Sequence, residues 1–311
     1  MKLIRSLAEG AFGEPSNLSI GVFDGVHLGH RYLLGKVIES ARASGHLSGV
    51  VTFDRHPEEL LAPHKDMRYL TTLAEKLQSL SELGPDFVVA LPFTSQLADT
   101  AARDFVLALL EHLQMRELWI GPDFALGRGR EGDGEYLDSL GQELGFQTHR
   151  PQPFSQSGTV VSSSSIRALI REGRIVDAAQ LLGRYPAVSG TVVRGARRGH
   201  GLGFPTANLA LEERLITPPD GVYAARVLWE AANHAGVVNV GNRPTFEQDG
   251  QTIVEAHILD FTGDLYSKNV RVEFVERLRP EQRFESVPAL IAQMETDVAD
   301  TRLVLQKAEL G

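Results

Sequence analysis

The sequence of 311 residues contains no cysteine, which excludes disulfides, cysteine-ligated zinc, iron–sulfur clusters and thiol catalysis. It also has no run of about 18 uncharged apolar residues, the length that a membrane-spanning helix needs. Basic residues are in deficit: the formal net charge is −9, and neither half of the chain is basic. Nonspecific binding to nucleic acid or to an anionic membrane requires a basic face, so we expect neither kind of partner.

What is present is typical of a globular protein, with 42% apolar and 23% charged residues. A chain of this length predicts two domains, since domains usually have about 100–200 residues. The first ten residues contain no apolar stretch of signal-peptide length, and we therefore expect a cytoplasmic protein. Weak self-association is left open.

The first half of the chain alternates short apolar segments with segments of helical periodicity. This alternation predicts an α/β domain over residues 1–183, with a Rossmann-like parallel sheet covered by helices on both faces. Ligands of such sheets bind beyond the carboxyl ends of the strands. The predicted strands are 18–23, 47–53, 86–93 and 117–121, and the predicted helices are 31–45, 70–84, 101–113 and 134–144.

The second half, 187–311, is rich in β-branched residues separated by Gly, Pro, Asn and Asp turns. This pattern favours a small antiparallel β-barrel followed by a C-terminal helix. The predicted strands are 187–193, 221–229, 235–241, 252–261 and 269–278. The closing helix has a stripe that we interpret as a packing face, formed by Val287, Leu290, Ile291, Met294 and Val298.

Residues 21–30 read GVFDGVHLGH and place two histidines around Gly29 where the first strand passes into a helix. Free backbone N–H groups and the positive end of the helix dipole attract phosphate there, and imidazole N–H groups can donate to its oxygens. The alternative is a pair of surface histidines at a helix cap. The position after the first strand favours a nucleotide site.

A second candidate segment, 161–167, reads VSSSSIR before another helical stretch. Its hydroxyls and arginine could close over the β- and γ-phosphates of the same nucleotide, although a serine run before a helix is also an ordinary N-cap with a linker. Residues 127–132 satisfy GxGxxG, but they do not follow the first strand and lack the acidic residue expected about 20 positions later. We interpret them as a loop.

In the second half, residues 194–209 read RGARRGHGLGFPTANL. If the segment is extended, Thr206 and Asn208 share one face and can hold Mg²⁺ beside phosphate; the alternative is an ordinary Gly/Pro turn. In 252–259, TIVEAHIL, alternation buries Val254, Ala256 and Ile258 and turns Glu255 with His257 to the other face. Glu255 could accept a proton from an alcohol nucleophile, or could simply be solvated.

Four of these segments together resemble the adenylyltransferase module of the bacterial bifunctional riboflavin kinase/FAD synthetase family: GVFDGVHLGH, VVTFDRHPEELL (50–61), GPDFALGRGREGD (121–133) and VSSSSIR. The resemblance implies that FMN phosphate attacks the α-phosphate of ATP. It implies catalytic roles for His27, His30 and Arg167 and a flavin site at His56, Pro57 and Phe124. The implied ATP site consists of Phe23, Asp24, Gly25, His27, Gly29, His30, Asp123, Ser162, Ser163, Ser164 and Arg167. The family usually has Thr at Ser164, Pro at Arg55 and Phe at Leu126, the last two beside the expected flavin pocket.

The segments LGFPTANL, GVYAARV, VVNVGNRPTF (237–246), VEAHILDFTGDLY (254–266) and LRPEQRF (278–284) resemble the riboflavin kinase module of the same family. This resemblance implies γ-phosphoryl transfer from ATP to the 5′-hydroxyl of riboflavin, with Glu255 as the base. It implies a Mg²⁺ site at Thr206 and Asn208, an ATP site that adds Gly201 and Gly203, and a flavin site at Asn239, Gly241 and Arg243. His200 stands where the family usually has arginine.

We therefore expect an enzyme that uses ATP and Mg²⁺ to make FMN and then FAD from riboflavin. One alternative is an FMN adenylyltransferase with a noncatalytic flavin-binding barrel; intact Thr206, Asn208 and Glu255 argue against it. Another is a binding module for RNA or a protein partner built on a nucleotidyltransferase fold, which the acidic charge of both halves disfavours.

Overall fold

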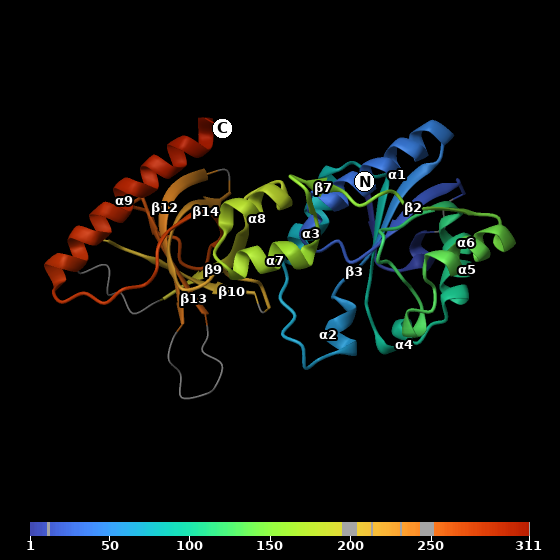
Figure 1. Cartoon of the computed structure of the whole chain (residues 1–311), viewed down its shortest axis with the longest axis horizontal. Helices are drawn as coiled ribbons and strands as arrows, with labels where there is room; N and C mark the ends of the chain where they lie inside the picture. Colours follow the sequence, from blue (N-terminus) through green and yellow to red (C-terminus); the bar gives the residue numbers. More distant parts are fainter. Residues whose placement is uncertain (11–12, 195–203, 213, 231, 243–251, 311) are drawn as a thin grey trace. The chain divides into compact units, whose positions relative to one another are not determined.

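We describe a computed structural model of the chain, covering residues 1–10, 13–194, 204–212, 214–230, 232–242 and 252–310. Contacts between residues divide the chain into two compact units. The first comprises Met1–Met67 and Leu73–Ser162; the second comprises Arg68–Thr72 and Ser163–Gly311. Each unit is built around a sheet of its own (Figure 1).

The sheet of the first unit has six parallel strands in the order β1-β4-β3-β2-β5-β6. From β2 the chain moves outward through β3 and β4 and then returns to the other side of β2 to form β5. The strand order therefore reverses beside β2, and open α/β sheets bind ligands at such a point. The strands are β1 (Lys2–Ile4), β2 (Ser16–Ile20), β3 (Leu47–Phe53), β4 (Phe87–Leu91), β5 (Met115–Trp119) and β6 (Gln147–His149).

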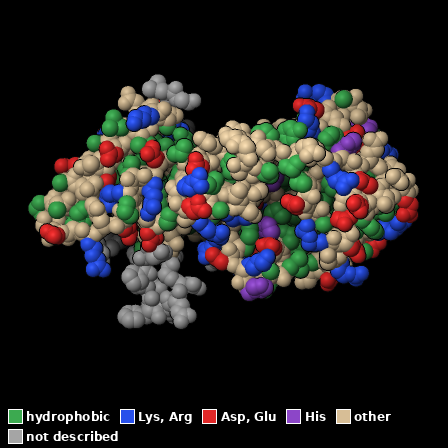
Figure 2. Space-filling model, in the orientation of Figure 1, with side chains coloured by type: hydrophobic (Ala, Val, Ile, Leu, Met, Phe, Trp, Pro, Cys, Tyr) green, Lys and Arg blue, Asp and Glu red, His purple; other side chains and the backbone are tan. Residues whose placement is uncertain are grey.

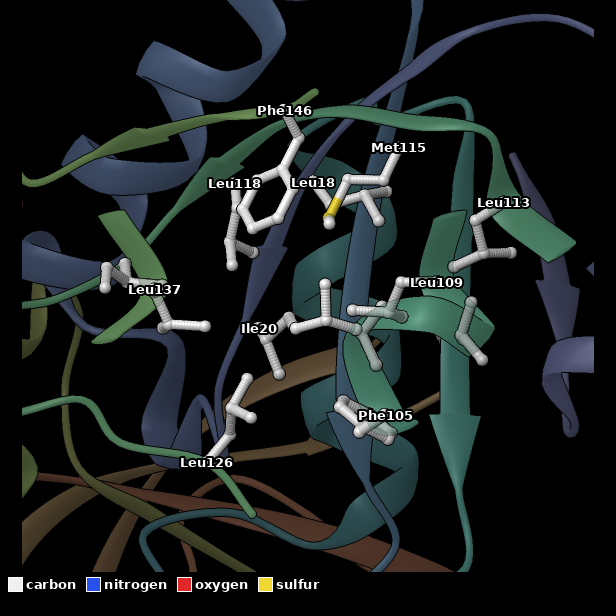
Figure 3. Packing of buried hydrophobic residues seen from close by; sticks show 14 of the residues in the cluster. Leu18, Ile20, Phe105, Leu109, Leu113, Met115, Leu118, Leu126, Leu137 and Phe146 are labelled. Atoms are coloured by element: carbon white, nitrogen blue, oxygen red, sulfur yellow. The ribbon is translucent and has the colours of Figure 1, made fainter. Parts of the chain in front are cut away.

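Helices cover both faces of this sheet, as the alternating pattern predicted. On one face Leu18 and Ile20 pack with Phe105 and Leu109 of α5 and with Leu137 of α6 (Figure 3). On the other face Val50 and Val88 pack with residues of α1 and α3. The helices are α1 (Leu28–Ser44), α2 (Pro57–Leu61), α3 (Leu73–Glu82), α4 (Ser95–Ala98), α5 (Ala102–Leu113) and α6 (Gly134–Leu144); a hairpin of β7 (Ser155–Gln156) and β8 (Thr159–Val160) follows.

The second unit contains a closed antiparallel barrel in the order β10-β13-β12-β11-β14-β9, which confirms the predicted barrel. Its interior is filled by alternate residues of the strands, among them Val188, Tyr223, Val254 and Phe274. The strands are β9 (Ala187–Val193), β10 (Ala207–Leu211), β11 (Gly221–Trp229), β12 (Ala232–Asn242), β13 (Thr252–Ile258) and β14 (Asn269–Arg279).

Two helices precede the barrel in this unit, α7 (Ser163–Arg171) and α8 (Ile175–Leu182). Ile175 is 2% exposed and belongs to the barrel's hydrophobic cluster, so α8 packs with the barrel although the chain reaches it before β9. The segment Arg68–Thr72 also joins this unit: the Tyr69 N–H donates to the Arg214 carbonyl, and the Ile216 N–H donates to the Tyr69 carbonyl.

The predicted C-terminal helix is present as α9 (Val287–Leu310), which packs on β11, β12 and β14 (Figure 1). Its apolar stripe is not the buried face that the spacing predicted. Val287 is 56% exposed, and Leu290, Met294 and Val298 are only half-buried. The buried positions of α9 are Asp297, Thr301 and Leu305. The stripe lines a cavity, because Leu290, Met294 and Val298 all face it.

Within the part of the chain that the structure describes, no helix has both the length and the apolar character needed to cross a membrane. Acidic and basic side chains are interspersed over the face of the molecule drawn in Figure 2.

Candidate active sites

The first candidate site begins where β2 ends, beside the reversal of strand order. A 3-10 turn, Asp24–Val26, carries the chain from the strand to α1. Phe23 and Val26 have φ values of 51° and 41°, a left-handed conformation that is unfavourable for side chains of this kind. The surrounding packing holds the turn, since Phe23, Asp24 and Val26 are all buried. Strain of this type is concentrated at functional sites.

His27 is the N-cap of α1, and its Nδ1 accepts a hydrogen bond of 3.3 Å from the backbone N–H of His30. A neutral imidazole that accepts at Nδ1 carries its proton on Nε2, which is then a donor. The His27 and His30 rings stack with their centroids 3.6 Å apart, and Phe23 meets His30 edge-on at 5.2 Å. The two predicted histidines therefore form one rigid pair at a helix N-terminus, where anions bind.

Gly29, in the first turn of α1, lies close to the backbone of Val161. A Cβ at this position would be 3.1 Å from the Val161 carbonyl oxygen and 3.2 Å from the His27 ring. Both approaches are tighter than most Cβ contacts, so a larger residue would require one of these neighbours to shift. Val161, which opens the predicted serine segment, is thus placed beside the HLGH turn by contacts within the first unit.

One residue at this site was not predicted from the sequence. Lys76 of α3 is 5% exposed, and its Nζ donates to the carbonyls of Val22, at 3.1 Å, and Phe53, at 2.7 Å. Burial lowers the pKa of Lys76 to about 8, against the opposing attraction of Asp24 and Asp54. The signal that could have found it is its place in the apolar spacing Leu73, Lys76, Leu77, Leu80 of the predicted helix.

The predicted flavin residues follow the neighbouring strands. His56 caps α2, accepting at Nδ1 from the Glu58 N–H at 3.1 Å, and Pro57 is the first residue of that helix. Phe124 packs against the hydrophobic core of the first unit. Asp123 is exposed, and its carbonyl accepts from Arg130 at 2.7 Å.

The GxGxxG sequence at 127–132 is a loop, as interpreted from the sequence, and it packs against the start of α5. A Cβ at Gly127 would lie 2.5 Å from the Ala102 nitrogen, and the Glu131 carboxylate accepts from that N–H at 2.8 Å. Leu126 is buried in the core, whereas the Arg55 side chain is half exposed, 3.6 Å from the Asp54 carboxylate.

The serine segment passes from one unit to the other. Ser162 is the last residue of the first unit, and Ser163, Ser164 and Arg167 belong to the second. Ser163 is the first residue of α7, Ser164 is exposed, and Arg167 is 8% exposed. The role of this segment at a nucleotide stays a prediction.

The second candidate site lies on the barrel, where strand register aligns three predicted residues. Asn208 of β10 is directly opposite Glu255 of β13, and Glu255 is directly opposite Asn239 of β12. Directly opposed residues of antiparallel strands have Cβ atoms about 4.5–5.5 Å apart on the same face. A carboxylate therefore stands between two side-chain amides. The alternation predicted for β13 is confirmed, with Val254, Ala256 and Ile258 buried and Glu255 half-buried.

Two cavities meet at Thr206, two residues before Asn208. One, of about 610 Å³, is lined by Thr206, Asn239 and Glu255, together with half-buried residues of α9. The other, of about 590 Å³, is lined by Pro205, Thr206 and the segment 261–266. Thr206 borders both, so a group bound in one cavity can approach a group bound in the other at this hydroxyl. His257 holds the segment that contains Pro205 and Thr206, because its Nδ1 lies 2.8 Å from the Pro205 carbonyl oxygen.

The outer wall of the larger cavity was not predicted. Arg279 at the end of β14 binds the Asp297 carboxylate through Nε at 2.9 Å and through a terminal nitrogen at 2.7 Å. Glu281 accepts a hydrogen bond of 3.2 Å from the Asn239 amide, and a Cβ at Gly241 would lie 2.6 Å from the same carboxylate. These contacts tie α9 and the segment after β14 to the strands that carry the predicted residues. Gly201, Gly203, His200 and Arg243 lie outside the described residues.

Comparison with known proteins assigns a family to each part of the chain. Residues 11–165 match the FAD synthetase family, and residues 182–305 match the riboflavin kinase family. The bifunctional riboflavin kinase/FMN adenylyltransferase of Escherichia coli K12 is 40% identical over 97% of this chain and 97% of its own length. Its counterpart in Listeria monocytogenes is 34% identical over 94% and 93%.

A crystal structure from Streptococcus pneumoniae, described as a macrolide-efflux protein, has a TM-score of 0.88 with this chain at 29% identity, covering 96% of this chain and 98% of that one. The folds, the two sites and the family matches define an enzyme with one nucleotidyltransferase unit and one kinase barrel. The chain belongs to the bifunctional riboflavin kinase/FMN adenylyltransferase family, which confirms the resemblance found in its motifs.

Proposed function

We propose that the barrel phosphorylates riboflavin to FMN with ATP and that the HLGH site adenylylates FMN to FAD with a second ATP. The observation that carries this proposal is the row Asn208–Glu255–Asn239, set beside a cavity of about 610 Å³ that Thr206 shares with a second cavity. Two cavities that share Thr206, one of them lined by the Glu255 carboxylate, suit the transfer of a group between two bound substrates.

In the kinase reaction, the 5′-hydroxyl oxygen of riboflavin bonds to the γ-phosphorus of ATP while the bond to the β–γ bridging oxygen breaks and ADP leaves. Glu255 accepts the hydroxyl proton, a role of general bases that contributes about 10²–10⁴ in rate. The larger cavity, lined by apolar residues of α9, suits the flavin, and the second cavity suits the nucleotide. Positioning of the two substrates supplies most of the remaining catalysis.

The chemistry of Thr206 and Asn208 fits a magnesium ion, since both provide uncharged oxygens that would hold it beside the phosphates of ATP. Such an ion would supply positive charge to offset the charge of the transferred phosphate. Asn208 is 7% exposed and faces Glu255 in register, so the protein holds the amide and the carboxylate at a fixed separation.

In the adenylyltransferase reaction, an FMN phosphate oxygen bonds to the α-phosphorus of ATP, and pyrophosphate leaves. The Nε2–H group of His27 donates to the triphosphate. The His30 ring, at the same helix start, stacks against the His27 ring. The free N–H groups at the start of α1, together with the positive end of its helix dipole, also attract the phosphates. We propose that Asp24 and Gly25 form the turn at the nucleotide. The outer phosphates are bound by Ser162, Ser163, Ser164 and Arg167. The residues proposed for the flavin and nucleotide are His56, Pro57, Asp123 and Phe124.

The test is incubation of the whole chain with riboflavin, ATP and Mg²⁺, with products separated by chromatography. We expect FMN to appear first and FAD to follow, with ADP and pyrophosphate as the respective by-products. If neither FMN nor FAD forms, the proposal is refuted. FAD formed only when FMN is supplied supports the alternative in which the barrel binds flavin without catalysis.

The cytoplasmic location, weak self-association and a functional boundary at 183–187 stay predictions. Sedimentation at several protein concentrations, with and without ATP, measures self-association directly. Cell fractionation measures location.

A further inference from the structure

Lys76 is a buried lysine that neither reaction described above uses. It lies in the apolar face of α3, where Leu80 is fully buried, and it is 5% exposed. An ammonium group has three donors and no acceptor, so it is costly to bury unless acceptors surround it. Lys76 meets this need with two backbone carbonyls, those of Val22 and Phe53.

These two carbonyls stand at the starts of the two turns that lead into the adenylyltransferase site. Val22 comes directly before Phe23 and Asp24, and Phe53 is the last residue of β3, just before the segment that leads to His56. The Val22 carbonyl also accepts from the Thr52 hydroxyl at 3.1 Å. Carbonyls that leave a sheet lose their ladder partners, and when buried they need other donors. Lys76 provides one donor to each turn.

Two carboxylates act on Lys76 from the elements packed around it. Asp24, in the 3-10 turn after β2, is 3% exposed, and Asp54 follows β3. Both favour the ammonium form, while burial disfavours it, and the balance lowers the pKa of Lys76 to about 8. At pH 7 the lysine is mainly charged. A positive charge is therefore held under the turn that carries Asp24 and leads to the histidine pair.

We propose that Lys76 is a positioning residue of the adenylyltransferase site, joining the ends of β2 and β3 so that the HLGH turn and the His56 turn keep one relative geometry. This inference rests on the proposed function of that site. The strained turn gives the link its purpose: Phe23 and Val26 hold left-handed conformations only while their surroundings restrain them. Lys76 also offsets the buried charge of Asp24, which would otherwise oppose a polyphosphate.

The experiment compares Lys76→Met, Lys76→Arg and the exposed control Lys36→Met in the full chain. Each variant is measured for adenylylation of supplied FMN and for phosphorylation of riboflavin. We expect Lys76→Met to lower kcat/KM for adenylylation about 10- to 100-fold, the range for loss of charged hydrogen bonds. Lys76→Arg recovers part of this loss. Riboflavin phosphorylation stays within about twofold in all three, which shows that the second unit is folded in each variant.

A pH profile separates positioning by the charged lysine from a purely structural role. In the wild-type protein, kcat/KM for adenylylation should fall as the pH rises through about 8, because Lys76 loses its charge. Lys76→Met and Lys76→Arg should lack this fall, since neither side chain titrates there. If Lys76→Met does not fold, the profile of Lys76→Arg decides alone.

Wild-type rates in Lys76→Met, or a fall near pH 8 that persists in Lys76→Arg, overturn the inference. A wild-type chain that makes FMN but no FAD refutes instead the function proposed for the HLGH site. The two failures are therefore distinct.

Discussion

Asn208 and Glu255 face each other directly across β10 and β13, and Asn208 is 7% exposed at this point of the barrel. The two residues come from segments far apart in the chain, and antiparallel register alone brings them opposite each other. Glu255 lines the larger cavity, and Asn208 is the buried residue directly opposite it on the neighbouring strand. Removal of either function should affect one of the two reactions and leave the other.

Glu255→Gln keeps the size of the side chain but removes its capacity to accept a proton. We expect kcat for riboflavin phosphorylation to fall about 10²- to 10⁴-fold while adenylylation of supplied FMN is unchanged. The control is Glu276→Gln, an exposed position on β14. Equal kinase rates in Glu255→Gln and the control would remove Glu255 from catalysis.

Gly29→Ala places a methyl group 3.1 Å from the Val161 carbonyl and 3.2 Å from the His27 ring. Displacement of either neighbour disturbs the histidine pair, so FAD synthesis from FMN should fall about tenfold or more, with kinase activity retained. Gly35→Ala on the same helix is the matched control, because nothing lies within 4 Å of its added methyl group. It should stabilise α1 by about 0.5–1 kcal/mol. Similar activities for the two variants would contradict the role of the close approach.

Arg279→Met breaks the ion pair with Asp297, whose side chain is only 4% exposed. A buried carboxylate left without its partner should cost about 3 kcal/mol, and the displaced wall of the cavity should raise KM for riboflavin. Arg302→Met breaks the pair with exposed Asp260 and should cost less than about 1 kcal/mol. With Trp119 replaced by Phe, the fluorescence of Trp229 reports unfolding of the barrel alone. A smaller loss of unfolding free energy in Arg279→Met than in Arg302→Met would contradict this prediction.

The stability of the first unit should depend on pH through Lys76. The pKa of Lys76 is about 8 in the folded protein, against the ordinary lysine value of 10.5. Between these values the unfolded chain binds more protons, so the free energy of unfolding rises with pH, by up to about 3 kcal/mol. Denaturant unfolding in a Trp229→Phe background, followed by Trp119 fluorescence, measures this rise. The rise should be absent from Lys76→Met; an equal rise in that variant would contradict it.

The helices before the barrel should contribute to its folding. Ile175 of α8 is buried in the barrel's hydrophobic cluster, so a fragment that begins at residue 187 exposes apolar surface that a fragment from 163 covers. Burial of one such side chain is worth about 1.5–3 kcal/mol. We expect fragment 163–311 to unfold at higher denaturant concentration than fragment 187–311. Equal midpoints would place the folding boundary at 183–187.

Local patterns in the sequence were enough to predict the parallel sheet, the barrel and the position of the HLGH turn. Alternation of apolar residues and strand–turn–helix order depend on neighbours within a few positions. The alternation that buries Val254, Ala256 and Ile258 and turns Glu255 to the other face follows from such local rules. The sequence motifs also identified the bifunctional riboflavin kinase/FMN adenylyltransferase family.

Tertiary structure decided which of these residues meet. The row Asn208–Glu255–Asn239 depends on the register of three strands, and a shift of one residue would turn each side chain to the other face. The helical periodicity of α9 predicted an apolar face, but packing buried Asp297 and left Leu290 and Met294 to line a cavity. The spacing of the helix placed Lys76 among apolar residues, but only the fold shows that its ammonium group bonds two backbone carbonyls. Composition and periodicity are properties of neighbouring residues, whereas register and the pairing of a buried charge are decided only when distant segments pack together.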